Sequence, residues 1–141
     1  MKLSTKGRYG LRALADLAAN AQDGPVSLSE TSGRQKISLN YLEQIFGKLS
    51  RAGIVTGVKG AGGGYKLARD MDQITAGEVL RALEGEISVV DAGEPSDPVQ
   101  AAVKSLLWDE IDRRVNGYLD ELTLGDLVRK YQKNLERKEI R

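Results

Sequence analysis

The stretch from Ser27 to Leu67, SLSETSGRQKISLNYLEQIFGKLSRAGIVTGVKGAGGGYKL, determines the fold that we predict for this chain. Ser27 stands three residues before Glu30, the capping-box pattern that begins a helix. Ser38 is a good N-cap for a second helix, whose apolar residues recur at helical spacing as Leu42, Ile45, Phe46 and Leu49. Two short helices joined by a tight turn predict a helix-turn-helix, whose second helix can lie in the major groove of DNA.

A glycine-rich segment follows the second helix directly. Residues 53–58 and 64–67 have the character of strands, and Lys59 lies near the tip of the loop between them. Six of the 16 glycines lie between Gly53 and Gly64. Glycine accepts positive φ and allows close backbone approach, which a tight hairpin pressed against a phosphate chain requires. The segment therefore predicts the wing of a winged helix.

These patterns have two other interpretations. Capped helices with polar faces also occur in small helical domains that bind no nucleic acid, where the polar face is simply solvated. The glycine run could instead be a nucleotide-phosphate loop. That loop would need a terminal Gly-Lys-Ser or Gly-Lys-Thr, or a helix after the glycines, whereas Tyr65-Lys66-Leu67 predicts a strand.

Composition excludes several classes of function. The 141 residues predict one compact domain with an appendage, and they include neither cysteine nor histidine. Disulfides, thiolate metal sites, histidine-ligated zinc and histidine-assisted nucleophiles are therefore excluded. An enzyme that uses carboxylates alone is a distant third alternative, because acidic residues are plentiful. No pair of carboxylates lies in an apolar setting that would tune it for acid–base catalysis, so we expect no enzyme. The chain has no membrane-length apolar stretch and no signal-peptide pattern at its start, which predicts a cytoplasmic location.

The charge is divided unevenly along the chain. Residues 1–70 contain 11 Lys and Arg against 5 Asp and Glu, a balance of +6, whereas residues 71–141 contain 10 against 15, a balance of −5. The positive half coincides with the predicted winged helix, as expected of a nucleic-acid-binding surface. In the first helix, capped by Ser4 or Thr5, the apolar stripe consists of Leu11, Leu14, Ala15 and Ala18, with Leu17 beside it. The phosphate-contact candidates of this helix are Lys6, Arg8 and Arg12.

The second half predicts a dimerisation element. Thr75 and Glu78 form a capping box for a helix that ends at Gly85, and Asp97-Pro98 begins a helix of about three to five turns. Its apolar band, wider than a small domain needs, contains Val99, Val103, Leu106, Leu107, Ile111, Val115 and Tyr118. A second copy of the helix would cover this band, and the homodimer would match a two-fold operator. Thr123 begins a last helix, with a tail that we expect to fray from Lys133. We therefore divide the chain into a DNA-binding domain (1–85), a sensor loop (86–97) and a dimerisation part (98–141).

Three segments, Met1–Gly10, Ser38–Gln44 and Lys59–Tyr65, resemble the family of bacterial winged-helix regulators that includes the iron–sulfur cluster regulator IscR and the cysteine-metabolism regulator CymR. The resemblance covers nearly the whole chain. It implies a mostly α fold with a small β-hairpin wing, a homodimer and a two-fold operator in double-stranded DNA. It also implies control of iron–sulfur cluster or cysteine genes, with a small molecule or an enzyme as co-regulator.

The resemblance also implies roles for individual residues. Its base-contact and wing positions are here Ser38, Asn40, Tyr41, Glu43, Gln44, Lys59 and Gly60. Arg8 and Lys48 complete the predicted DNA-binding set. Many relatives have arginine at the position of Lys59, and lysine keeps the charge without the planar fork. Glu43 could accept a hydrogen bond from a cytosine amino group, or it could merely pair with Lys48 or Arg51 on the helix surface.

The chain departs from the cluster-binding relatives at the predicted sensor loop. Those relatives hold a 2Fe–2S cluster with three cysteines, and the candidate positions of lost ligands here are Ala92, Ala101 and Ser105. Without thiolates we expect no metal site and no cofactor. Either this is a natural cluster-free branch, or cysteines were replaced to trap the cluster-free form, and only then would the original chain hold a cluster.

A contrasting hypothesis is a winged helix that binds only proteins, as an adaptor without specific DNA binding. An adaptor needs neither the basic half nor Lys59 at the wing tip. Its binding would also not weaken steeply with salt.

Overall fold

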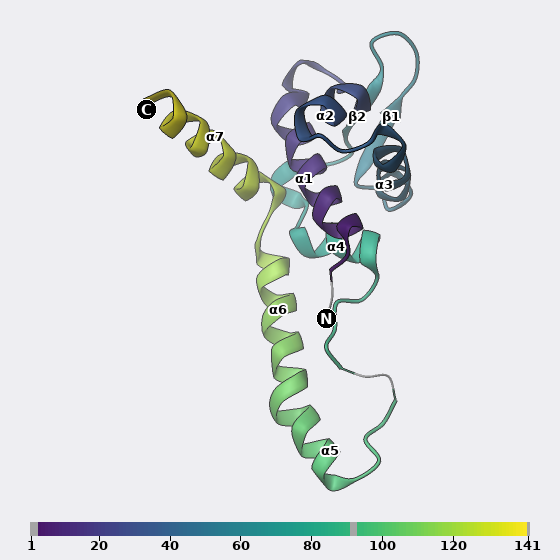
Figure 1. Cartoon of the computed structure of the whole chain (residues 1–141), viewed down its shortest axis with the longest axis vertical. Helices are drawn as coiled ribbons and strands as arrows, with labels where there is room; N and C mark the ends of the chain where they lie inside the picture. The colour runs from purple at the N-terminus through teal and green to yellow at the C-terminus, as the bar shows by residue number, and fades with distance from the viewer. Residues whose placement is uncertain (1–2, 91–92, 141) are drawn as a thin grey trace.

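The structure, a computed structural model, describes residues 3–90 and 93–140. The elements of its N-terminal part are α1 (Thr5–Asn20), α2 (Leu28–Gln35), α3 (Leu39–Arg51), β1 (Val55–Val58), β2 (Gly64–Leu67) and α4 (Ala76–Glu84). Together they form the upper body in Figure 1, with the two-stranded hairpin beside α3. The predicted fold, mostly α with a small β-hairpin wing, is confirmed.

The two helices of the helix-turn-helix begin and end where local chemistry requires. The Oγ of Ser27 accepts from the amide of Glu30 (3.2 Å), and the Oγ of Ser38 accepts from the amide of Tyr41 (3.1 Å). Between them Lys36 adopts a left-handed φ of 56°, which ends α2 and redirects the chain. The predicted inner face of α3 is buried, at Leu42, Ile45, Phe46 and Leu49.

The hairpin is antiparallel and pairs Val55 with Leu67 and Val58 with Gly64. Val26 forms an isolated antiparallel bridge to Tyr65 of β2. Its amide donates to the carbonyl of Tyr65 (2.9 Å), and its carbonyl accepts from the amide of Tyr65 (2.8 Å). β1 begins at Val55 and not at Gly53, since Gly53 and Ile54 still donate to carbonyls of the last turn of α3. This connection fixes the wing directly against the second helix of the motif.

Helix α1 lies at the centre of the core and contacts α2, α3 and α4. Its buried residues are Gly7, Gly10, Ala13, Leu14, Leu17 and Ala18. Of the predicted stripe, Leu14 and Ala18 are buried, whereas Leu11 and Ala15 are half-buried and pack against the edge of the core. The stripe is shifted because α1 has neighbours on several sides, so helical spacing alone did not locate the centre of its buried face.

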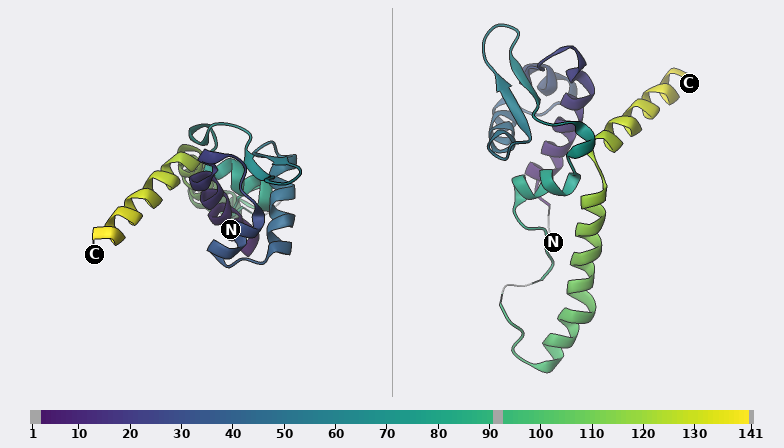
Figure 2. Two further views of the ribbon diagram at one scale, coloured as in Figure 1. Left: turned by 90° about the horizontal axis from the view of Figure 1, so that it is seen from above. Right: turned by 180° about the vertical axis from the view of Figure 1, so that it is seen from behind.

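The C-terminal part leaves this body as a long rod. Helix α5 (Pro98–Val103), capped by Asp97, continues through a π-turn (Lys104–Trp108) into α6 (Asp109–Glu121) without a break, so the rod is longer than predicted. Helix α7 (Leu124–Ile140) then projects in another direction (Figures 1 and 2). It continues through the segment after Lys133 that was expected to fray. Within residues 3–90 and 93–140, no helix is both long and apolar enough to cross a bilayer.

Contacts of the start of α7, and contacts of α6, attach the C-terminal part to the winged helix. The amide of Leu124 donates to the carbonyl of Ile74 (2.8 Å), and the amide of Ala76 donates to the carbonyl of Leu122 (2.8 Å). Leu124 and Val128 are buried in the common core, so the start of α7 packs with the N-terminal helices. Arg81 of α4 donates to Asp120 and Asn116 of α6, both at 2.8 Å. These contacts set the direction of α6 relative to α4.

Candidate nucleic-acid interface

The outer face of α3 presents polar side chains to solvent. Ser38, Asn40, Glu43 and Gln44 are all exposed, because the opposite face of the same helix is buried in the core. The oxygen of Ser38 accepts from an amide of its own helix, which leaves the hydroxyl proton available to a donor–acceptor partner outside the chain. The structure thus gathers four of the predicted base-contact residues on one surface.

Tyr41, the fifth predicted base-contact residue of α3, has a different environment. It is half-buried, and its hydroxyl lies 2.9 Å from the Oγ1 of Thr5 at the start of α1. Its ring meets the ring of Tyr9 edge-on, with centroids 6.1 Å apart, and the guanidinium of Arg12 lies over Tyr9 at 4.9 Å. Tyr41 therefore also positions α1 against α3, a role that sequence reasoning missed because Thr5 and Tyr9 lie on another helix.

Glu43 is exposed, and no ion pair joins it to Lys48 or Arg51 in the described part of the chain. Its carboxylate is consequently free to accept a hydrogen bond from a ligand. A lone carboxylate on a surface that approaches phosphates lowers affinity, but it can discriminate in favour of a cytosine amino group. The surface geometry is compatible with that predicted role.

The tip of the wing contains the second predicted contact region. Lys59 and Gly60 are exposed in the loop between β1 and β2, at the top of Figure 1. The loop is closed by the amide of Gly63, which donates to the carbonyl of Gly60 (3.0 Å), and Gly60 itself has a φ of 96°. β1 contacts α3, so the strand that leads to the charged wing tip is packed beside the helix with the polar face.

Two lysines from different helices lie together beside this unit. The positive charge of Lys6, in the first turn of α1, lowers the pKa of Lys48 of α3 by repulsion, and Arg51 adds to this effect. Neighbouring ammonium groups that repel each other favour a shared anion between them. A DNA phosphate is the anion that a helix-turn-helix protein would place there.

Some of the other basic residues form ion pairs with carboxylates of the chain, and others are exposed to solvent. Arg34 pairs with Asp16 (2.8 Å), and Arg69 pairs with Glu78, so these two charges are partly neutralised within the chain. Arg8 is exposed and donates to the backbone carbonyl of Leu3 (3.2 Å). Lys36, which sequence reasoning missed, is exposed in the turn just before α3. Its place between two capped helices was the signal that could have identified it.

Glu84, at the end of α4, holds the start of α1 in place. Its carboxylate accepts from the amides of Ser4 (2.7 Å) and Gly7 (3.1 Å) and from the hydroxyl of Ser4. Burial acts to raise the pKa of Glu84, but these hydrogen bonds and the charge of Lys6 together lower it below its ordinary value. The sequence offered no sign of this contact, since only packing brings the two helix ends together.

The positions proposed for lost cluster ligands offer no metal-binding chemistry. Ala101 is exposed on α5, and the hydroxyl of Ser105 donates to the carbonyl of Ala102 (3.4 Å); Ala92 lies outside the described residues. The whole sequence lacks thiol and imidazole groups. Across residues 3–90 and 93–140, no three carboxylates converge as a metal ion would require. The donor set therefore does not fit an iron–sulfur cluster or a bound iron ion.

The predicted dimerisation residues form an apolar band on the rod. Leu106 is 83% exposed, Tyr118 64% and Leu107 46%, whereas Ile111 and Val115 are half-buried. Val99, at 73%, extends the band towards the start of α5. The single chain thus leaves several large apolar side chains uncovered along one helix.

Comparisons with known proteins agree with this geometry. A family profile, Rrf2, described as an iron-dependent transcriptional regulator, matches residues 3–130. The HTH-type transcriptional regulator IscR of Photobacterium profundum is 42% identical over 132 residues, which cover 92% of this chain and 76% of the relative. Among solved structures, CymR, the global cysteine regulator of B. subtilis, has a TM-score of 0.82 and 42% identity, covering 92% of this chain and 98% of that one. IscR of T. potens has a TM-score of 0.78 and 37% identity, with 95% and 90% covered.

Proposed function

Because the chain belongs to the Rrf2 family of transcriptional regulators, we propose that it acts as a homodimer on a two-fold DNA operator. The observation that carries this proposal is one unit in which the exposed polar face of α3 packs beside the strand that leads to Lys59 at the wing tip. The positive charges of Lys6 and Lys48 beside this unit would supply phosphate contacts. Ser38, Asn40, Glu43 and Gln44 would contact base edges in the major groove.

The apolar band of the rod supports the homodimer. Exposed leucines and aromatics in a row along one helix lose unfavourable contact with water when a second copy covers them. A two-fold arrangement of rods would also place two copies of α3 on one side of the DNA, at successive major grooves. The proposed dimer residues are Leu106, Leu107, Ile111, Val115 and Tyr118.

We propose further that this regulator binds DNA without iron. The family is described as iron-dependent, but the donor set of this chain fits neither an iron–sulfur cluster nor an iron ion. The similarity to IscR and to a global cysteine regulator supports target genes of iron–sulfur cluster or cysteine metabolism. Regulation would then depend on a signal other than a bound cluster.

Selection of DNA from a random pool, followed by a salt series on the recovered sequence, tests the proposal. We expect a two-fold sequence and an affinity that falls by roughly a hundredfold or more between about 50 and 200 mM salt. Addition of ferrous iron or of a chelator should leave the affinity unchanged. A pool without any enriched sequence, and binding that is insensitive to salt, would instead favour the protein-binding adaptor.

A further inference from the structure

A cavity of about 310 Å³ lies between the sensor loop and the first turns of the rod. On the loop side it is lined by Val90, Gly93, Glu94 and Pro95, and on the rod side by Val99, Gln100, Val103, Lys104 and Trp108. Its volume is at the lower end of the range that small-molecule sites occupy in proteins. None of the residues assigned to DNA contact above lines it, although Val99 and Val103 also belong to the apolar band of the rod.

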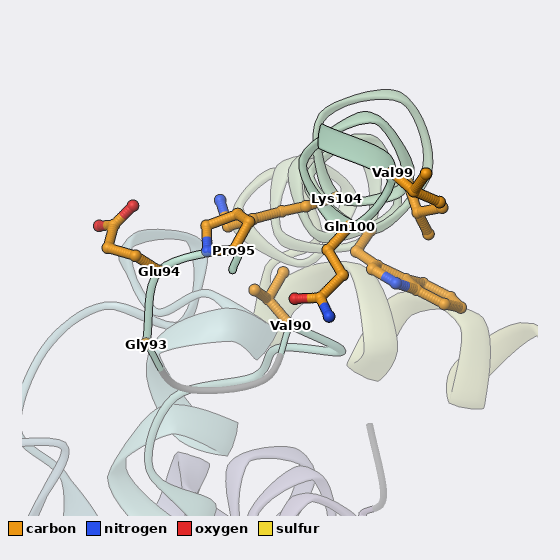
Figure 3. A pocket seen from close by; sticks show the side chains of 9 residues that line it. Val90, Gly93, Glu94, Pro95, Val99, Gln100 and Lys104 are labelled. Atoms are coloured by element: carbon orange, nitrogen blue, oxygen red, sulfur yellow. The ribbon is translucent and has the colours of Figure 1, made fainter. Parts of the chain in front are cut away.

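The walls of the cavity combine an apolar body with hydrogen-bond donors. Val90, Pro95, Val99, Val103 and Trp108 supply aliphatic and aromatic surface. Figure 3 shows the side chains of Gln100 and Lys104 extending from the rod towards the loop, while the carboxylate of Glu94 points away from them. The amide oxygen of Gln100 already accepts from Ser96, so the group that it can still offer is its NH₂ donor.

Lys104 is positioned at this cavity by the π-turn. Its ammonium contacts both carboxylate oxygens of Asp109 at 3.1 Å, a pair five residues apart that the wider turn brings together. An ammonium has three protons, so it can bind Asp109 and still donate to a ligand. The remaining hydrogen-bonding capacity of Lys104 and Gln100 therefore consists of donors.

We propose that this cavity binds a small carboxylate with an aliphatic or aromatic body. The apolar walls would hold the body, and Lys104 and Gln100 would donate to the carboxylate. This inference rests on the proposed function, because it names the chemical class of signal that a cluster-free regulator senses at this loop. The site lies where the loop meets the rod, so its occupancy bears on the shape of the dimerisation element.

The test uses Trp108, the only tryptophan of the chain, whose emission reports directly on the cavity. The full-length protein is titrated with 3-phenylpropionate and, as a probe of equal size and opposite charge, with 3-phenylpropylamine. We expect a saturable change in Trp108 emission with 3-phenylpropionate, with a dissociation constant of about 1 mM or below for a probe of about ten heavy atoms. The amine should bind at least about fivefold more weakly, because an ammonium cannot accept the hydrogen bonds that Lys104 and Gln100 donate.

Variants locate the binding. Val90→Phe fills the cavity from the loop side and should abolish binding of both probes. Lys104→Met keeps the stem but removes the charge, and should reduce the preference for the carboxylate to about twofold or less. Lys130→Met, the same change on the exposed surface of α7, should behave as the parent chain. Circular dichroism of each variant verifies that it folds.

Three results would overturn the inference. Emission that ignores both probes but changes with protein concentration would mean that a second copy covers the cavity. Unaltered binding by both Val90→Phe and Lys104→Met would place the probe elsewhere, and equal affinity for acid and amine would contradict the carboxylate class. Operator binding is measured on the same samples without probe, to separate failure of the cavity proposal from failure of the proposed function. Intact DNA binding without any response to the probes would contradict only the cavity proposal.

Discussion

Lys59 is an exposed charge at the tip of the hairpin, away from the core. It lies at the wing tip, where the backbone turns tightly, and the chain beyond it returns to pair with β1. A flexible lysine at this place contributes charge without the bidentate geometry of an arginine. Its expected contribution is therefore to affinity and salt dependence more than to the choice of sequence.

We predict that Lys59→Ala lowers operator affinity about tenfold and reduces the steepness of its salt dependence. A dimer loses two phosphate contacts, so the slope of log K against log salt should fall by about 2. Fluorescence anisotropy over a salt series measures both values. Lys130→Ala, an equal loss of charge on α7, should leave the slope as it is; an equal effect of both variants would show that only net charge matters.

Glu84 predicts a pH dependence of stability. Its pKa is lowered in the folded chain, so its hydrogen bonds contribute stability above the ordinary glutamate pKa of about 4.3, and this contribution is lost as the pH falls through the folded-state value. We expect Glu84→Gln to reduce the free energy of unfolding by about 1 kcal/mol near pH 7, after allowance for solvent screening. Below about pH 4 the difference from the parent chain should shrink.

Urea denaturation at a series of pH values measures this difference. The exposed Glu121→Gln serves as the control and should change the free energy of unfolding by less than about 0.5 kcal/mol at each pH. A difference between Glu84→Gln and the parent chain that stays constant from pH 7 to pH 3 would contradict the role assigned to the carboxylate.

At the scale of elements, α3 depends on a residue that is also part of the proposed DNA-binding surface. Ser38 caps the helix, and its hydroxyl is exposed on the predicted base-contact face. Ser38→Ala should cost about 1 kcal/mol in unfolding free energy and also weaken DNA binding. Ser38→Asp keeps a capping oxygen, so stability should be retained while the added negative charge repels DNA. Thermal unfolding and anisotropy, measured together, separate the two roles; if Ser38→Asp binds DNA normally, Ser38 only caps.

The hairpin depends on glycine where two backbones meet. Gly64 has a φ of 150°, and a Cβ added there would lie 2.2 Å from the carbonyl oxygen of Val26. We expect Gly64→Ala to destabilise the chain by about 2 kcal/mol or more, since neither backbone can move without breaking the Val26–Tyr65 pairing. Gly33→Ala in α2 should instead stabilise the chain by about 0.5–1 kcal/mol, since a Cβ added there would have no neighbouring side chain or strand within 4 Å. Denaturant midpoints decide between these opposite signs.

At the scale of the whole molecule, the predicted dimer rests on the rod. We expect Leu106→Glu to produce a monomer in light scattering and to abolish binding to a two-fold operator. Leu106 is 83% exposed in the single chain, so the helical content of the monomer should be retained. Gln132→Glu on the exposed surface of α7 adds the same charge and should remain dimeric. A Leu106→Glu variant that is still dimeric would assign dimerisation to another surface.

Helix α4 contacts both the start of α1 and the rod. Its last residue, Glu84, bonds to the start of α1 beside the basic pair, and Arg81, one turn earlier, bonds to Asp120 and Asn116 of the rod. Asp112 of the same rod accepts from the amide of Val89 (2.7 Å) and from the hydroxyl of Ser88, next to the cavity. Hydrogen-bonded groups on α4 thus join the rod to the start of α1.

Sequence by itself determined the features that arise from local chemistry. Ser27, Ser38, Thr75 and Asp97 each cap the helix that the pattern predicted, because an N-cap acts on amides two or three residues away. The polar face of α3 and the wing followed from helical spacing and from glycine at tight turns. These interactions depend on neighbours in the chain, so a single sequence contains them.

Tertiary structure alone decided which distant groups meet. The bond of Tyr41 to Thr5, the proximity of Lys6 and Lys48, and the contact of Glu84 with α1 all join separate helices. The buried face of α1 and the cavity between the sensor loop and the rod likewise depend on how helices pack against one another. Helix packing follows from the shape of the whole core, and no periodicity within one helix specifies its neighbours.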